Sequence, residues 1–117
     1  MSGGGGLVSS AHDYHRFMMM IANGGELDGA RLLSPNTVDL MTMNQLPGNA
    51  DISQFGRPID LENAYDGFGF GLGFSVLVDP AAAKLHGSLG DVGWGGAAST
   101  TFWIDRVKSL KIGRAHV

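Results

Sequence analysis

The stretch GFGFGLGFSVLV, residues 67–78, constrains the fold more than any other part of the sequence. Glycine occupies the odd positions from 67 to 73, and the even positions are apolar: Phe68, Phe70, Leu72, Phe74, Val76 and Val78. Because successive side chains of a strand point to opposite faces, this alternation predicts one strand with an apolar face and a bare face. A bare face lets another backbone approach closely, and no G-x-x-x-x-G-K sequence supports a phosphate-binding loop instead.

Two helices are predicted before this strand. The first is expected to begin after Ser10, which has the S-x-x-D spacing of a capping box with Asp13. Its apolar residues recur at helical spacing until the sequence Asn23-Gly24-Gly25, which is typical of a helix end. The second is expected from Ser34, with Val38, Leu40 and Met41 facing inward and Pro47-Gly48 closing it.

The remaining segments predict an α+β fold. Asp28-Gly29 suits a two-residue turn, so residues 26–33 are expected to form a small hairpin between the helices. Residues 48–66 show no period and are expected to form a surface loop. Two further strands are predicted in DVGWGG and ASTTFWID, so the helices precede an antiparallel meander.

Composition excludes several classes of partner. The net charge is −3 and the few basic residues are scattered, so we expect no nucleic-acid partner. No apolar run reaches the ~18 residues of a membrane span, and the first residues lack the features of a signal peptide. His12 and His15 could touch one metal ion, but no third ligand is evident, so we expect neither a metal nor another cofactor.

The nucleophile motifs of known hydrolases are missing from the chain. It contains no G-x-S-x-G elbow, and no lysine lies three residues after a serine, so there is no S-x-x-K pair. Gly93-x-Gly95-x-x-Ala98 fits the loose dinucleotide fingerprint, but a strand-like sequence follows it where a helix is required. The carboxylates Asp79, Asp91 and Asp105 fall at strand ends, and their separation decides whether any two could act together.

Three segments in order carry a resemblance to a known family: GGGGLVSSAHDYHRFMMMIANGGELDGARLLSPNTVDLMT, YDGFGFGLGFSVLVDP and GDVGWGGAASTTFWID. Together they resemble the C-terminal part of serine hydrolases of the β-lactamase-related superfamily. That superfamily includes class C β-lactamases, penicillin-binding proteins and family VIII carboxylesterases. The resemblance implies a penicillin-recognising fold, an antiparallel sheet flanked by helices, and acyl transfer through a serine ester.

The resemblance also implies roles for a short run of residues. The family's S-x-x-K and Y-x-N motifs are absent here, whereas Trp94-Gly95-Gly96 stands in the place of its K-T-G motif. The resemblance implies that Trp94, Gly95 and Gly96 bind a small ester or amide substrate along a strand edge. It further implies that the backbone N–H of Ala97 forms half of an oxyanion hole. Without the lysine of K-T-G, ester substrates are favoured over β-lactams.

The chain is expected to consist of a long native part and a short tail. Residues 1–111 are expected to be an incomplete C-terminal portion of a β-lactamase-related domain, inactive alone and without the strand that should follow Asp105. Residues 112–117 match the peptide that a common sequencing adapter encodes, so we expect a non-native tail. A non-catalytic binding or structural relative of the same fold remains the alternative, as does an independent small α+β domain.

Overall fold

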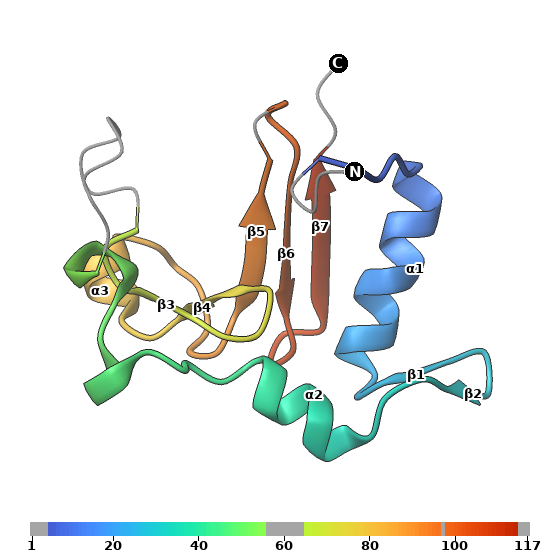
Figure 1. Ribbon diagram of the computed structural model, residues 1–117, viewed down its shortest axis with the longest axis horizontal. Helices are drawn as coiled ribbons and strands as arrows, with labels where there is room; N and C mark the ends of the chain where they lie inside the picture. The colour runs from blue at the N-terminus through green and yellow to red at the C-terminus, as the bar shows by residue number, and fades with distance from the viewer. Residues whose placement is uncertain (1–4, 56–64, 97, 115–117) are drawn as a thin grey trace.

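The computed structural model describes residues 5–55, 65–96 and 98–114. A five-stranded antiparallel sheet in sequence order forms its centre, and helices lie against it (Figure 1). The strands are β3 (Phe68–Phe70), β4 (Ser75–Leu77), β5 (Val92–Gly95), β6 (Thr101–Asp105) and β7 (Leu110–Arg114). The α+β prediction is therefore confirmed.

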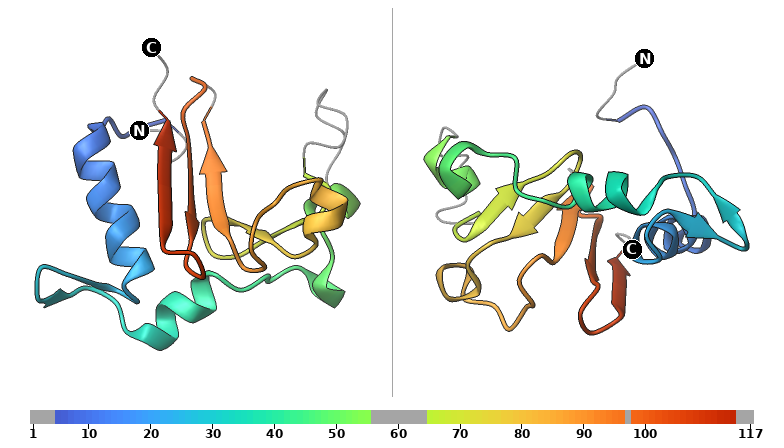
Figure 2. Two further views of the ribbon diagram at one scale, coloured as in Figure 1. Left: turned by 180° about the vertical axis from the view of Figure 1, so that it is seen from behind. Right: turned by 90° about the horizontal axis from the view of Figure 1, so that it is seen from below.

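Helix α1 (Ala11–Ala22) begins and ends as the sequence predicts. The Ser10 hydroxyl accepts a hydrogen bond from the Asp13 N–H at 3.1 Å, which satisfies a donor that the helix leaves free. After the helix, Gly24 and Gly25 have φ angles of 73° and 100°, a left-handed conformation that turns the chain away. Helix α1 packs beside β6 and β7 (Figure 2).

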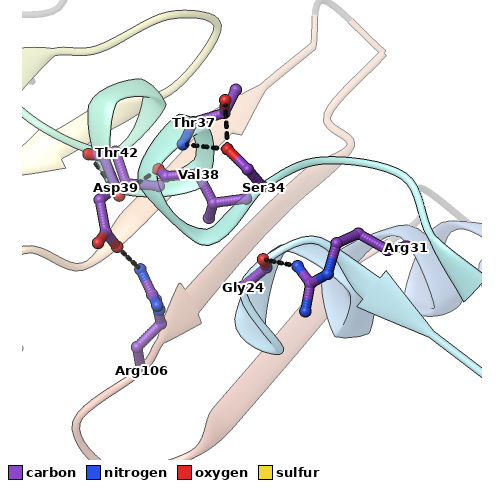
Figure 3. Close-up of polar contacts among 8 residues, drawn as sticks. All are labelled: Gly24, Arg31, Ser34, Thr37, Val38, Asp39, Thr42 and Arg106. Atoms are coloured by element: carbon purple, nitrogen blue, oxygen red, sulfur yellow. Dashed lines mark hydrogen bonds and ion pairs between the residues drawn. The ribbon is translucent and has the colours of Figure 1, made fainter. Parts of the chain in front are cut away.

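A small hairpin, β1 (Glu26–Leu27) and β2 (Ala30–Arg31), connects the two main helices. Asp28 and Gly29 have φ angles of 51° and 79°, as a type I′ turn requires, so the predicted hairpin is confirmed. The Arg31 guanidinium donates to the carbonyl of Gly24 at 3.1 Å (Figure 3). This bond fixes the hairpin to the end of α1.

Helix α2 (Pro35–Met41) is shorter than predicted. The Ser34 hydroxyl accepts from the Thr37 N–H at 3.1 Å, as expected for a cap (Figure 3). The helix ends at Met41 and not at Pro47, and Thr42 caps this end by donating its N–H at 3.0 Å and its hydroxyl at 2.8 Å to the Val38 carbonyl. Leu40 is 50% exposed, so its predicted inward orientation is wrong, and Val38 is the buried residue of this short helix.

The glycine-rich stretch forms two strands, β3 and β4, and the prediction of a single strand is wrong. The chain reverses at residues 71–74, where Gly73 has a φ of 99° and the N–H of Gly71 donates to the Phe74 carbonyl at 2.8 Å. Leu72 at the reversal is 50% exposed. Glycine permits both a bare strand face and a reversal, so the alternation alone does not distinguish the two.

The predicted close approach to the bare face is confirmed. A Cβ on Gly69 would overlap the carboxamide of Asn44, and a Cβ on Gly71 would overlap the carbonyl oxygen of Met41. The end of α2 and the chain that follows it therefore lie directly on the glycine side of this hairpin.

The apolar core lies between one face of the sheet and the helices. Its buried members are Met18, Met20, Ile21, Val38, Phe74, Val76, Val92, Phe102 and Ile104. The opposite face carries Trp103, Leu110 and Ile112, which are 43%, 47% and 39% exposed. The opposite face is open around these three residues, whereas Leu77 and Asp105 on the same face are 2% and 3% exposed.

The meander continues past Asp105. Strand β7 pairs with β6 from Asp105↔Leu110 to Thr101↔Arg114, so the expectation that the next strand is missing is wrong. Its residues 112–114 belong to the segment expected to be a non-native tail, and they nevertheless pair with Thr101, Phe102 and Trp103.

Three short elements complete the described part. Turns of 3₁₀ helix lie at Pro47–Asn49 and Ile52–Gln54 within the predicted loop, of which residues 56–64 lie outside the described residues. Helix α3 (Pro80–Ala83) follows β4, and the Asp79 carboxylate caps it by accepting from the Ala82 N–H at 3.1 Å. Among the helices described, none combines the length and apolar character needed to cross a bilayer.

Candidate functional site

The C-terminal end of β5 extends beyond its neighbour β4. Pairing with β4 stops at Ser75↔Gly93, whereas pairing with β6 continues through Trp94↔Phe102 to Gly95↔Thr101. Past Gly93, the side of β5 away from β6 thus has no strand partner among the described residues. This free edge is where the sequence predicts substrate to lie.

Trp94 is held in place by two aromatic rings. It stacks on Tyr65 at 5.8 Å between ring centroids and meets Phe70 edge to face at 5.0 Å. Aromatic contacts of this kind are each worth ~0.5–1.5 kcal/mol beyond burial. The Thr101 hydroxyl donates to the Trp94 carbonyl at 3.3 Å, and the residue stays 38% exposed. The indole is therefore a fixed wall with an accessible face.

The glycines of this segment are bare for different reasons. A Cβ on Gly93 would overlap the Phe102 carbonyl of β6, and one on Gly96 would come within 2.6 Å of the Thr100 hydroxyl. A Cβ on Gly95 would meet only the Thr100 carbonyl at 3.5 Å, which is an ordinary contact. Neighbouring protein atoms therefore explain Gly93 and Gly96 but leave the surface of Gly95 free. Ala97, the predicted oxyanion donor, lies outside the described residues.

Two cavities meet at Trp94 and Gly95. The larger, of about 560 Å³, extends over the sheet face that carries Trp103. The smaller, of about 450 Å³, lies between β5, β6 and the N-terminal half of α1, with Gly96 in its wall. Both volumes lie in the ~300–1,000 Å³ range of ligand pockets. The predicted substrate residues Trp94, Gly95 and Gly96 are thus brought together at one cavity.

Tyr14 of α1 lines the smaller cavity and packs against Phe102 at 5.1 Å between ring centroids. Burial raises the pKa of its phenol above the ordinary value, because the charged form would lose solvation. The Tyr14 phenol is therefore neutral at physiological pH.

None of the serines in the described part of the chain donates its hydroxyl to a histidine or lysine. Ser75 donates to the Gly93 carbonyl at 2.8 Å, and Ser88 donates to the Asp105 carboxylate at 2.7 Å. A serine becomes a nucleophile when an adjacent base takes its proton. Neither of these two serines has a histidine or lysine in that position. The described residues also contain no group of three side chains suited to a metal ion, so His12 and His15 form no metal site with them.

Two of the three carboxylates left open by the sequence come together at the far end of the larger cavity. Asp91 and Asp105 are 9% and 3% exposed, and the Ser88 N–H donates to Asp91 Oδ2 at 3.1 Å. Burial raises the pKa of Asp91, and the adjacent Asp105 carboxylate adds to the increase. Burial opposes ionisation of Asp105 too, but hydrogen bonds from Lys108 N and Ser88 Oγ outweigh it, so the pKa of Asp105 is lowered.

Asp91 Oδ1 has no hydrogen-bond partner among the described residues. Both carboxylates line the larger cavity, at the end of β5 and β6 opposite to Gly95 and Thr101.

Comparison with solved structures identifies the fold. The chain superposes on EstCE1, a hydrolase with promiscuous acyltransferase activity, with a TM-score of 0.68 and 22% identity over 90% of this chain. It also superposes on unliganded simvastatin synthase (LovD) from Aspergillus terreus, with a TM-score of 0.70 and 23% identity over 92% of this chain. The chain has part of a β-lactamase-like fold.

The β-lactamase-like fold is only partly present in this chain, which covers 24% of EstCE1 and 29% of LovD. Two Mycobacterium tuberculosis proteins, Protein Rv1367c and Uncharacterized protein MT1414, are each 41% identical to it over 106 residues. The match covers 87% of this chain and 25% of each mycobacterial protein, so the chain spans about a quarter of these relatives. No protein-family model matches the sequence.

The sequence did not predict the contacts that support this site. Tyr65 precedes the glycine run and Phe70 lies within it, yet nothing in their local pattern indicates a contact with Trp94. The β3–β4 turn brings Phe70 there, and the glycine at 73 was the available signal for that turn.

Proposed function

We propose that this chain is the substrate-binding part of a β-lactamase-like serine hydrolase that acts on small esters or amides. The observation that carries the proposal is the free edge of β5 at Trp94 and Gly95, which lies where two cavities meet. An ester has an acyl side and an alcohol side, and two cavities that meet at one strand end can receive one on each side. The similar fold of EstCE1, a hydrolase, supports the reaction class.

Each residue has a distinct role in this proposal. Trp94 forms the wall between the acyl and alcohol sides, and Gly95 lets the substrate backbone approach β5. The N–H of Ala97 donates to the oxyanion that forms when a serine attacks the carbonyl carbon. The serine, its base and the second oxyanion donor belong to a larger protein. Residues 1–111 of this chain are the C-terminal portion of that protein.

The proposal is tested first by the coding sequence upstream of this chain. An S-x-x-K motif followed by Y-x-N is the expected result. Their absence would contradict the proposal and favour a non-catalytic binding relative.

The second test uses the enzyme that contains both motifs. Losing one oxyanion donor costs ~10²–10³ in kcat, so Ala97→Pro is expected to lower kcat by about that factor. Ala97→Gly keeps the N–H and serves as the control. Trp94→Ala is expected to change KM and substrate preference more than kcat, because it removes a wall and not a reacting group. Full kcat in a folded Ala97→Pro enzyme would refute the role of Ala97.

A further inference from the structure

Asn44, in the segment after α2, uses every hydrogen-bonding position of its side chain. Its Nδ2 donates to Asn49 Oδ1 at 3.0 Å and to the Ala50 carbonyl at 2.9 Å. Its Oδ1 accepts from the N–H of Leu46 at 3.1 Å and from the N–H of Phe70 at 3.0 Å. A carboxamide offers two donors and two acceptor sites, so none remains free. Asn44 therefore connects its own loop to a distant strand.

The connection to the strand is specific to Phe70. Besides the bond to Asn44 Oδ1, the Phe70 carbonyl accepts from the Gln45 N–H at 2.8 Å. Both backbone groups of Phe70 are thus held by neighbouring residues of one segment. The carboxamide reaches this position because residue 69 is glycine, where any Cβ would overlap it.

The ring of Phe70 carries this constraint to Trp94. The two rings meet edge to face at 5.0 Å between centroids, with an interplanar angle of 78°. We propose that Asn44 is a positioning residue that holds the Trp94 indole in its orientation through Phe70. The widths of the two cavities at Trp94 then depend on a residue that lines neither of them. This inference rests on the proposed function only for its effect on substrate selection.

The test uses the fluorescence of Trp94 in the purified 117-residue chain. The chain has two tryptophans, so Trp103→Phe leaves Trp94 as the single emitter. In that background Asn44→Ala is expected to shift the emission to longer wavelength and to increase quenching by acrylamide, because the indole loses its fixed, partly buried position. The readout involves no hydrolysis, so it stands or falls separately from the proposed function.

Asn49→Gly is the matched control. It removes one acceptor of Asn44 Nδ2, leaves the Phe70 bond intact, and suits the positive φ of 54° at this position. Emission and quenching equal to those of the Trp103→Phe chain are expected. If Asn44→Ala and Asn49→Gly change Trp94 equally, or if neither changes it, the proposal is overturned.

Asn44→Asp decides the matter if Asn44→Ala does not fold. A carboxylate still accepts from the N–H of Phe70 but lacks both Nδ2 donors. The expected result is a lower melting temperature together with the Trp94 emission of the Trp103→Phe chain. Red-shifted emission from folded Asn44→Asp would overturn the proposal. It would show that the two bonds of Asn44 Nδ2 within its own loop, and not the bond to Phe70, hold the Trp94 indole in its orientation.

Discussion

Replacing Asp91 by asparagine is expected to stabilise the chain. Asp91 is buried beside Asp105, and its Oδ1 has no hydrogen-bond partner. A carboxamide has nearly the same shape and carries no charge. With its Oδ1 in the present position of Oδ2, it still accepts from the Ser88 N–H, and its Nδ2 can donate to the Asp105 carboxylate.

The size of the effect follows from these two changes. An unsatisfied buried acceptor costs ~1–3 kcal/mol, and a hydrogen bond to a charged group contributes ~1.5–3 kcal/mol. The two ranges describe the same contact and are not added, so Asp91→Asn is expected to raise the free energy of unfolding by ~1–3 kcal/mol near pH 7.5. For a chain of this size the melting temperature should rise by roughly 4–12 °C.

The stabilisation should depend on pH. The pKa of Asp91 is raised in the folded chain above the reference value of 3.8, so the folded state binds this proton more tightly than the unfolded state. The parent therefore loses stability as pH rises from the unfolded pKa through the folded pKa. Asp91→Asn removes that loss, so its advantage is largest above the folded pKa and closes below about pH 4, where Asp91 is protonated in both states.

Urea or thermal melts of parent and variant from pH 4 to pH 8 measure the difference. Asp79→Asn is the control, because Asp79 is exposed and its capping oxygen is retained in asparagine. A variant no more stable than the parent at pH 7.5 would refute the reasoning that the unpartnered, buried Asp91 oxygen destabilises the parent. So would a stabilisation of equal size at every pH, because it would not come from a titrating group.

Three other outcomes are expected. The purified chain should neither hydrolyse p-nitrophenyl esters above background nor label with a fluorescent penicillin, since it lacks an activated nucleophile; covalent labelling of any of its serines would count against this. Gly93→Ala should cost ~1–3 kcal/mol because its Cβ overlaps β6, whereas Gly95→Ala should change stability by less than ~0.5 kcal/mol; equal losses in thermal melts would contradict the distinction. An independent copy of the coding sequence should carry different codons from Ile112 onward, and recovery of the same six codons and stop would refute the adapter origin.

The features that the sequence predicted are those decided within a few residues. The caps at Ser10 and Ser34 and the turn at Asp28-Gly29 each depend on bonds or dihedral angles inside one short segment. Tertiary packing does not need to be known for such bonds, so sequence patterns predicted them correctly.

The features that the sequence missed depend on pairing between distant segments. Asn44 reaches Phe70 across 26 positions of the chain, and its own sequence context is that of an ordinary loop. Asp91 and Asp105 meet because β5 and β6 pair antiparallel, and their separation could be stated only once the register was known. The β3–β4 reversal was missed because its apolar alternation is also that of a continuous strand.

The spacing of the glycines at 67, 69, 71 and 73 fixes the number of residues in this segment. A Cβ at residue 67 would overlap the Asp79 carbonyl, one at 69 the Asn44 side chain and one at 71 the Met41 carbonyl, while residue 73 has a φ of 99°. One residue inserted or deleted before Gly67 leaves the spacing within the run unchanged, so glycine still occupies all four positions. A single insertion inside the run would instead place phenylalanine or leucine at several of the four at once. Residues 67–73 are therefore expected to tolerate neither an insertion nor a deletion.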